Sequence, residues 1–500
     1  MNVTKIIIAF LLVFQSTLYA QKRDNVWMLG DYFNHSNYGL NFNLGTADTF
    51  GLQRDMQIFL DNASICDTSG NILFYSNGVY IANRNNDTLN GSDGFNPGYF
   101  TDYAIQNDDG LAIYNGILII PHPGEQQNYL VVHESAENIT WNSTTVSHPL
   151  NLAWSEISMG LDGGLGGIIP GKKDLHLIDD TLAIGRIAAV KHGDGRDWWV
   201  LAHRFNSNIY FRFLITPDTI IGPQMQAIGS VNPGINYVGQ AIFSPDGTKF
   251  CFQISELLIE EYDFDRCTGL LSNPSPIPIN DSSYTVMGCA FSPNGRYLYA
   301  CNNIFLHQFD TYSANIASSD VVVAQWDTFN IPGPTVFNTM KVAPDNRIYI
   351  NTYVGTNMLH YIEFPDNPGT GCNVVQNSFL TPSYNTYCFP NSPNWDLGPA
   401  IGSVCDSLSV GIATDTRRDK VDISPNPSQN YFWIKYDFQL NANASIEIYN
   451  ALGNSIMKKT LYGNSRALLI HTDNLQNGMY YFVVRIDDFK ITDGKLMILK

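Results

Sequence analysis

The chain has few charged residues, and it has no excess of basic ones. Charged side chains make up 15% of the 500 residues, below the ~25% of a typical soluble domain. Lys and Arg number 28 against 46 Asp and Glu, for a formal net charge of −18. Because nucleic-acid phosphates are bound by a basic face, no nucleic-acid partner is expected.

Long apolar runs are also missing. After Phe14 no run approaches the ~18 residues of a membrane-spanning helix, so none is predicted. Lys5 precedes a short apolar run that begins at Ile6, and the small residue Ala20 follows it, which is the pattern of a secretory signal peptide over residues 1–20 with cleavage after Ala20. A buried N-terminal strand is the alternative. No cysteine occurs before Cys66, so a lipoprotein anchor is not expected.

The motifs that identify many enzymes and metal sites do not occur. The sequence contains no Gly-x-Ser-x-Gly, His-Glu-x-x-His or EF-hand pattern. Its eight cysteines form no Cys-x-x-Cys pair, so a zinc site is not expected. In an exported protein such cysteines form structural disulfides or stay as buried thiols. No cofactor is predicted.

The sequence does contain a repeated hairpin motif, with six copies at intervals of about fifty to seventy residues. Each copy has an apolar strand, a turn rich in Pro, Asp, Asn and Gly, and a second strand rich in aromatic and β-branched residues. The six turns lie at Cys66–Gly70, Pro121–Gly124, His192–Asp197, Phe243–Gly247, Phe291–Gly295 and Val342–Asn346.

The turn chemistry explains this composition. Proline presets a negative φ, Asp or Asn caps the turn, and glycine takes the positive φ that reverses the strand, as predicted for Gly247 and Gly295. Asn346 replaces glycine in the last copy. Sheets repeated at this period stack around an axis, so the sequence predicts an all-β fold, a roughly seven-bladed β-propeller. The seventh blade is expected from both chain ends, residues 26–29 and 39–42 joining a strand near 394–397.

The last eighty residues form a separate β pattern. Strand-like alternation at residues 446–449 and glycine turns predict a small Ig-like β-sandwich. Prolines that cannot extend a β-ladder mark its entry. The residues that define the pattern are Pro425, Asn426, Pro427, Gly453, Gly478, Tyr480 and Lys495.

In this order, these elements resemble the type A C-terminal sorting domain of the type IX secretion system. The resemblance implies export across the outer membrane of a Bacteroidetes-type bacterium, with the secretion machinery and a sortase-like protease as partners. An ordinary Ig-like module without a sorting role is the alternative. The predicted domains are a signal peptide (1–20), a propeller (21–408), a charged linker (409–420) and the sorting domain (421–500).

The middle of the chain also carries a resemblance. The segments Leu161–Gly166, Ala189–Trp199, Tyr262–Cys267 and Phe389–Pro399 are similar to secreted Bacteroidetes propeller proteins, and the Ser-Pro-Asp-Gly turns resemble WD40-like and YVTN-like repeats. The resemblance implies a fold and a location and no established activity. The chain departs from the better-known propellers in lacking a regular Trp-Asp ending and in a long insertion between Glu134 and Asp174.

Few residues are candidates for chemistry. His122, His192 and His203 lie in or beside predicted hairpins and could hold a metal or act as acid and base near the axis. Completion of turn hydrogen bonds is the favoured interpretation. Asp194 and Asp197 flank Arg196 and could act on a glycosidic bond, but mutual capping within one turn is favoured.

Two further sets of residues have both a functional and a structural interpretation. The Asn- and Asp-rich segment from Asn83 to Asp93 could bind calcium, yet its spacing fits no known loop, and a solvated connector is favoured. Aromatic side chains could stack on sugar rings, but aromatic residues in blades are usually core. These side chains are Trp141, Trp154, Trp198, Trp199 and Tyr237.

The sequence therefore predicts a secreted or cell-surface protein that passes through the periplasm. Its expected function is a non-catalytic binding or adhesion module whose ligand is a protein or a glycan, because propeller loops offer a broad face and no catalytic constellation is evident. The alternative is a secreted hydrolase or lyase acting on polysaccharide, with its site near the propeller axis.

Overall fold

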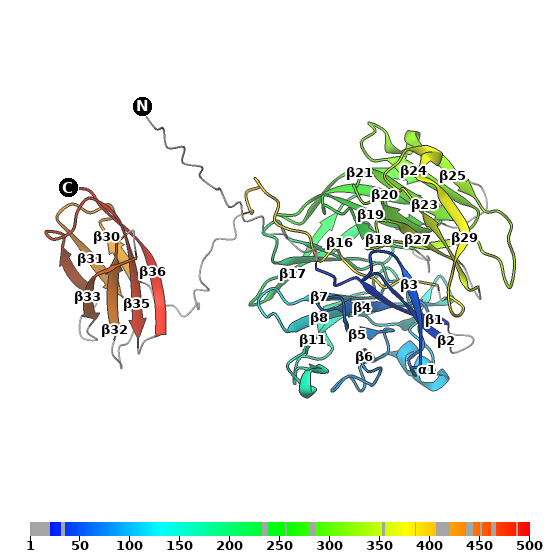
Figure 1. Ribbon diagram of the computed structural model, residues 1–500, viewed down its shortest axis with the longest axis horizontal. Helices are drawn as coiled ribbons and strands as arrows, with labels where there is room; N and C mark the ends of the chain where they lie inside the picture. Colours follow the sequence, from blue (N-terminus) through cyan, green and yellow to red (C-terminus); the bar gives the residue numbers. More distant parts are fainter. Residues whose placement is uncertain are drawn as a thin grey trace, which may run out of the picture. The chain divides into compact units, whose positions relative to one another are not determined.

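The computed structural model describes residues 21–500 except 32–35, 233–238, 256–257, 280–285, 353–355, 386, 407–420, 437–443, 451–452, 462–466 and 487–488. The predicted signal peptide with Ala20, the linker at 409–420 and Tyr237 lie outside the described residues. The chain divides into two compact units, Met1–Ser407 and Leu408–Lys500, and Figure 1 shows that strands make up most of each.

Seven antiparallel sheets of three or more strands follow one another along the described part of the first unit, from β1 to β29. The first sheet contains β1 (Val26–Asp31), β2 (Ser36–Asn41) and β3 (Asp48–Leu52). The second contains β4 (Ala63–Cys66), β5 (Ile72–Ser76) and β6 (Ile81–Asn83), and the helix α1 (Tyr99–Asn107) follows it.

The third sheet holds the long insertion. It has the order β12-β11-β8-β7, with β13 also paired to β11, and a separate hairpin joins β9 to β10. The strands are β7 (Ile117–Pro121), β8 (Asn128–Glu134), β9 (Glu137–Trp141), β10 (Thr144–His148), β11 (Asn151–Ser158), β12 (Gly167–Ile168) and β13 (Leu175–Asp179). A short 3-10 helix, η1 (Asp162–Gly164), lies in the glycine-rich turn between β11 and β12.

The remaining four sheets of this unit are regular four-stranded meanders. The fourth and fifth contain β14 (Ala188–Lys191), β15 (Trp198–His203), β16 (Ile209–Ile215), β17 (Ile220–Ala227), β18 (Ala241–Phe243), β19 (Lys249–Ser255), β20 (Leu258–Asp265) and β21 (Leu270–Pro278). The sixth and seventh contain β22 (Val286–Phe291), β23 (Tyr297–Asn302), β24 (Phe305–Asp310), β25 (Val321–Gln325), β26 (Phe337–Val342), β27 (Ile348–Thr352), β28 (Met358–Ile362) and β29 (Val374–Leu380). Two 3-10 helices, η2 (Ile316–Ser319) and η3 (Gly369–Cys372), precede β25 and β29.

The sheets close into a ring. Consecutive sheets touch through their first strands, in the series β1, β4, β7, β14, β18, β22 and β26. Apolar clusters fill the spaces between consecutive sheets. A further cluster joins the last sheet to the first, where the rings of Trp27 and Tyr349 meet edge to face at 6.1 Å. The predicted β-propeller is confirmed.

All six predicted hairpins are present as antiparallel pairs of strands. Gly247 and Gly295 have φ of 71° and 75°, and Asn346 has φ of 63°, as the turn chemistry predicts. Asp246 Oδ1 accepts the Ser244 hydroxyl and the Thr248 backbone N–H, so this turn is stabilised from within.

The prediction for the closing blade is wrong in one part. Residues 26–29 and 39–42 do contribute β1 and β2, but the strand expected near 394–397 does not form, and no strand lies in the described residues 381–406. Pro390 and Pro393 each lack the N–H that a β-ladder requires. This segment has another role, described below.

The second unit is the predicted small β-sandwich. Its two sheets have the orders β30-β31-β34 and β33-β32-β35-β36. Along β31, Phe432 and Ile434 point into a shared apolar core, whereas Tyr431 and Trp433 point outward, the period-2 alternation of a half-buried strand. The strands are β30 (Val421–Ser424), β31 (Tyr431–Tyr436), β32 (Ala444–Tyr449), β33 (Ser455–Leu461), β34 (Ala467–His471), β35 (Gly478–Ile486) and β36 (Phe489–Ile498).

Candidate functional sites

After the last propeller sheet, the chain returns through the ring axis. We call residues 387–396 the axial segment. Thr339 Oγ1 donates to the carbonyl of Tyr387 at 2.8 Å, near the start of β26. Further on, Asn394 Nδ2 donates at 2.8 Å to the carbonyl of Pro245, just beyond the end of β18. The segment therefore runs the length of the inner strands.

Between these two points the axial segment bonds the entrances of three more sheets. The N–H of Asn391 donates to the carbonyl of Asn62 at 2.8 Å, before β4. Its side-chain Nδ2 donates to the carbonyls of Asn115 at 3.4 Å and Ile187 at 3.1 Å, before β7 and β14. The indole Nε1 of the buried Trp395 donates to the carbonyl of Ile119 at 3.1 Å, within β7. This one segment thus occupies part of the axis and bonds it to the surrounding sheets.

A cavity of about 670 Å³ lies along the inner strands, beside the axial segment. Its walls include residues of β14, β18, β22 and β26, the axial segment from Phe389 onward, and residues that precede β1. Most of the lining side chains are apolar, such as Leu118, Ile242 and Phe291. A hollow of this kind suits an uncharged group of a larger ligand.

One ion pair lies in the cavity wall. Asp24 Oδ2 is 3.0 Å from Nζ of Lys341, and Asp24 Oδ1 accepts hydrogen bonds from Trp27 Nε1 at 3.1 Å and Ser392 Oγ at 3.2 Å. Burial raises the pKa of Asp24 above its ordinary value, and Lys341 opposes that shift. The pair joins the start of the first sheet to β26, and its polar atoms are already engaged within the fold.

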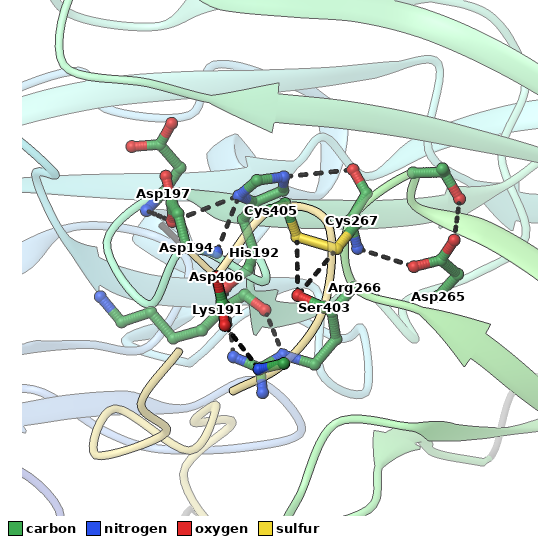
Figure 2. The surroundings of a disulfide bond; sticks show 12 residues. Lys191, His192, Asp194, Asp197, Asp265, Arg266, Cys267, Ser403, Cys405 and Asp406 are labelled. Carbon is green, nitrogen blue, oxygen red and sulfur yellow. Dashed lines mark hydrogen bonds and ion pairs between the residues drawn. A yellow bond between two sulfur atoms is a disulfide. The ribbon is translucent and has the colours of Figure 1, made fainter. Parts of the chain in front are cut away.

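Beyond the axis the chain is secured by a disulfide between Cys267 and Cys405. Figure 2 shows the disulfide beside His192 and Arg266. The Arg266 guanidinium donates to the carbonyl of Lys191 at 2.9 Å, of His192 at 3.1 Å and of Gly398 at 2.5 Å. This residue therefore ties the β14–β15 turn to the chain that leaves the axial segment. The other six cysteines are buried thiols.

The charged cluster of the β14–β15 turn is engaged in capping. Asp194 Oδ1 accepts the backbone N–H of Arg196 at 2.8 Å and of Asp197 at 2.9 Å, and Arg196 Nε donates to Asp197 Oδ1 at 2.7 Å. Although burial opposes it, His192 and these N–H groups hold the pKa of Asp194 well below its usual range. The carboxylates are held by their own turn, as the favoured interpretation predicted.

The candidate histidines lie in three separate places. His122 Nδ1 accepts the backbone N–H groups of Gly124 and Glu125 at 3.1 and 3.2 Å, within its own turn. His192 Nε2 lies 3.1 Å from the carbonyl of Cys267. Although burial lowers the pKa of His192, its hydrogen bond with Asp194 raises it above the ordinary value. These two histidines complete turns, as predicted.

His203 is different because it is buried among aromatic rings. It stacks on Phe252 with ring centroids 4.8 Å apart and meets Tyr210 edge to face at 4.5 Å. Burial lowers the pKa of His203 to about 3, and Arg186 acts in the same direction. At neutral pH it is an uncharged part of the core.

The proposed aromatic platforms are also largely core. Trp198 and Trp199 are 0% and 2% exposed, and their Nε1 atoms donate to the carbonyls of Pro121 at 3.1 Å and Arg266 at 2.9 Å. Trp154 packs against the core cluster of sheets two to four. Trp141 is half-buried against Phe205, with ring centroids 4.9 Å apart.

A buried acidic pair was missed by the sequence analysis. Asp61 and Glu134 are both 0% exposed. Burial raises the pKa of Asp61 to about 8 and the pKa of Glu134 well above its ordinary value, and the nearby Arg186 partly opposes the second shift. Asp61 precedes β4 and Glu134 ends β8, so only the folded ring brings them together. In the part of the chain that the structure describes, no three His, Cys, Asp or Glu residues form a metal-binding group.

In the second unit, the Pro425–Pro427 part of the predicted motif lies against the edge strand β36, which contains Lys495. Asn426 Nδ2 donates to the carbonyl of Lys495 at 2.8 Å, and Asn426 Oδ1 accepts the N–H of Met497 at 2.9 Å. Ser428 continues this contact, donating its N–H to the Met497 carbonyl at 2.8 Å. The Pro425–Ser428 segment therefore covers backbone groups that an open sheet edge would offer to another strand.

The other motif residues shape turns. Gly453 has φ of 83° in the turn after β32, and Gly478 begins β35. The hydroxyl of Tyr480 accepts the N–H of Gln476 at 3.0 Å and lies 3.1 Å from its carbonyl, so this side chain holds the approach to β35. Lys495 pairs with Tyr481 in the register of β35 and β36.

Residues 422–499 match the family model described as the secretion system C-terminal sorting domain. The second unit is a sorting domain of the type IX secretion system, as the resemblance implied. The domain implies interaction with the type IX secretion machinery. The protein is therefore exported, to be secreted or attached at the cell surface. No helix among the described residues is long and apolar enough to cross a membrane.

No curated protein is significantly similar to the chain. Among solved structures, a proposed 6-phosphogluconolactonase from Bacteroides fragilis is 12% identical, with a TM-score of 0.42 over 73% of this chain and 97% of that one. A second proposed 6-phosphogluconolactonase, from Bacteroides uniformis, is 11% identical, with a TM-score of 0.36 over 94% and 99%. The Cps50 (Swd1) β-propeller domain of Myceliophteria thermophila is 8% identical, with a TM-score of 0.37 over 65% and 92%. Likenesses this low carry no argument about this chain.

Proposed function

We propose that the propeller is a non-catalytic binding or adhesion module, displayed at the cell surface or released after export. The observation that carries the proposal is the axial segment, because it fills the place where a propeller enzyme gathers its catalytic groups. Asn391 and Trp395 donate to backbone carbonyls there. A ligand that enters the adjoining cavity would meet this segment and apolar inner-strand residues such as Ile242 and Phe291.

The surrounding chemistry supports the same proposal. His122 and Asp194 accept hydrogen bonds from their own turns, and His203 is a core side chain with a strongly lowered pKa. Groups that serve as acid and base in glycoside hydrolysis face each other across a substrate, whereas each of these groups is engaged within its own turn or in the core. The cavity along the inner strands and the loops around it remain as the surface for a protein or glycan ligand.

The secretion machinery delivers this module, and we propose that a sortase-like protease removes the sorting domain after transport across the outer membrane. The linker at 409–420 is charged through Arg417, Arg418 and Lys420, a composition that suits cleavage between domains. The mature form would then be the propeller alone, free or attached at the surface.

The test is a comparison of binding with turnover. Purified propeller is incubated with a panel of extracellular polysaccharides and surface proteins, and both complex formation and the release of reducing or unsaturated ends are measured. Saturable binding without turnover is expected, and it should survive His122→Ala and His203→Phe. Metal-dependent turnover that either substitution abolishes would instead establish the alternative, a secreted hydrolase or lyase.

A further inference from the structure

The five residues that follow the predicted signal cleavage site are all held by the propeller. Gln21, Lys22, Asp24 and Asn25 line the cavity. Each of the residues 21–25 makes at least one hydrogen bond or ion pair outside its immediate neighbours. The contacts after residue 21 join the N–H of Lys22 to Thr68 O (3.5 Å), the N–H of Cys66 to Arg23 O (2.9 Å), Asp24 Oδ2 to Lys341 Nζ (3.0 Å) and Asn25 Nδ2 to Asn43 Oδ1 (3.1 Å).

Gln21 itself is bound at both its backbone and its side chain. Its backbone N donates to Oδ1 of Asp396 at 2.9 Å, and its side-chain Oε1 accepts Nε of Arg23 at 2.7 Å. Arg23 is held in turn by Tyr129, whose hydroxyl lies 3.1 Å from Nη1 and whose ring lies beneath the guanidinium. Asp396 ends the axial segment, and its own N–H donates to Asn394 Oδ1 at 3.1 Å. Both partners of the Gln21–Asp396 bond are thus anchored in the fold.

Cleavage after Ala20 would change the chemistry of this bond. In the precursor, the Gln21 nitrogen is a peptide N–H. After hydrolysis it is an α-amine with a pKa of ~7.7–8.0 in a free chain, and hence mostly an ammonium at neutral pH. The same atom, in the same place, would then make a charge-assisted hydrogen bond, a stronger class than a neutral one.

We propose that Asp396 is the receptor for the Gln21 α-ammonium that signal-peptide removal creates, so that maturation strengthens the closure of the propeller ring. The proposal depends on cleavage after Ala20 and is independent of the proposed binding function. The bond joins residue 21, at the start of the ring, to residue 396, at its end. Among the described residues, the first and last sheets exchange no strand, so contacts of this kind take the place of a shared blade.

The surroundings suit a positive charge. Burial raises the pKa of Asp396, the Gln21 N–H and the Arg23 charge oppose that rise, and the Asp24 charge adds to it. An ammonium at Gln21 would further favour the ionised carboxylate. Arg23 is the nearby cation, and its guanidinium is engaged by Gln21 Oε1 and Tyr129.

One chemical consequence distinguishes this arrangement from a free N-terminus. An N-terminal glutamine cyclises when its uncharged α-amine attacks the side-chain carbon Cδ. A new C–N bond forms, the bond from Cδ to the amide nitrogen breaks, and ammonia leaves. A protonated amine has no lone pair for this attack, and Arg23 holds the side-chain oxygen in place. Asp396 should therefore preserve Gln21 as an open glutamine.

The test uses the full mature protein recovered after export, and the same chain with Asp396→Asn. Asp93→Asn serves as the matched control, because Asp93 is an exposed aspartate remote from Gln21 in sequence and outside the cavity lining. Intact mass and N-terminal sequencing identify the first residue, and mass spectra over time report the loss of ammonia. The pH dependence of α-amine acylation reports the pKa of the N-terminus.

The expected wild-type result is an open Gln21 with an α-amine pKa above the free-chain value. Asp396→Asn should lower that pKa and speed cyclisation roughly two- to fivefold, the range of a partly exposed ion pair, whereas Asp93→Asn should change neither. A chain with one alanine added before Gln21 keeps Asp396 but moves the amine, so its amine pKa should be that of a free chain. A different first residue, a fully cyclised wild-type Gln21, or equal pKa and rate in wild type and Asp396→Asn would overturn the proposal.

Discussion

The carboxylate of Asp61 accepts the backbone N–H of Gly116 through Oδ1 at 3.0 Å, and the N–H of Ile117 joins the same oxygen at 3.1 Å. Asp61 precedes the inner strand of one sheet, and Gly116 precedes that of the next. The carboxylate thus links two neighbouring blades at their entrances. It does so while fully buried and beside a second buried acid, Glu134.

This position predicts a pH dependence of stability. The pKa of Asp61 is raised from 3.8 to about 8 by burial, so the folded state keeps a proton that the unfolded chain releases above pH ~4. The free energy of unfolding should therefore fall as pH rises from ~4 to about 8. Asp61→Asn keeps an oxygen for both N–H groups and removes this titration, so its stability relative to wild type should increase over that window.

Chemical denaturation of both proteins at pH 5 and pH 8 measures this difference. Glu134 also contributes to the pH dependence of the wild type, because its pKa is raised in the same direction. The test is therefore the difference in stability between wild type and Asp61→Asn, compared at the two pH values. An unchanged difference at the two pH values would mean that Asp61 does not titrate in this window.

Two glycines at matching turn positions should differ in their tolerance of a side chain. Both have positive φ, where a β-branched residue costs on the order of 1–3 kcal/mol. A Cβ at Gly247 would also come within 2.6 Å of Val190 Cγ2 and 2.8 Å of Leu397 Cδ2, whereas at Gly295 the nearest atom is 3.8 Å away. Gly247→Val should therefore lower the free energy of unfolding more than Gly295→Val does, as measured by urea denaturation. Equal losses would show that backbone strain alone decides the cost.

Loss of the disulfide should destabilise the propeller by about 2–4 kcal/mol, the typical value for a native bridge. Cys267 and Cys405 are separated by 138 residues, so the bridge restrains a long stretch of the unfolded chain. Cys267→Ser, Cys405→Ser and the double variant should lose the same stability, because either single change already breaks the bond. Thermal melting and limited proteolysis near residue 405 report the effect, and additive losses would assign separate packing roles to the two side chains.

Removing residues 421–500 should leave a folded propeller in the periplasm, because the sorting domain carries the export information. Cell fractionation with a proteolysis assay of the propeller measures both properties. Asn426→Ala is a finer change, since it opens the contacts with the backbone of β36 while leaving the domain in place. Truncated protein outside the cell at wild-type levels would contradict a sorting role.

The turns of the propeller could be predicted because their chemistry is local. The turn from Ser244 to Lys249 is stabilised by hydrogen bonds among its own residues, with Asp246 and the Ser244 hydroxyl as acceptors. The same holds for the capping of Asp194 by its own turn. Patterns of this length are visible in a sequence, which is why the six hairpins and the core placement of the aromatics followed from it.

The axial segment could not be predicted in the same way. Asn391 bonds the backbone of Asn62, more than three hundred positions earlier in the chain, and no periodicity connects them. Cys267 and Cys405 likewise meet only because the ring closes. Pro390 and Pro393 lack the N–H that a β-ladder requires. They are a sequence feature that could have corrected the prediction of a strand near residues 394–397.

The disulfide also decides how the propeller carries mechanical load. Cys405 lies two residues before the end of the first unit, so a pull transmitted along the chain from the sorting-domain side reaches the propeller at this bond. The force then enters at Cys267, in the turn between β20 and β21, and not at the last sheet. The sixth and seventh sheets and the axial segment lie inside the covalent loop, so tension on the chain beyond Cys405 does not unravel them from their free end.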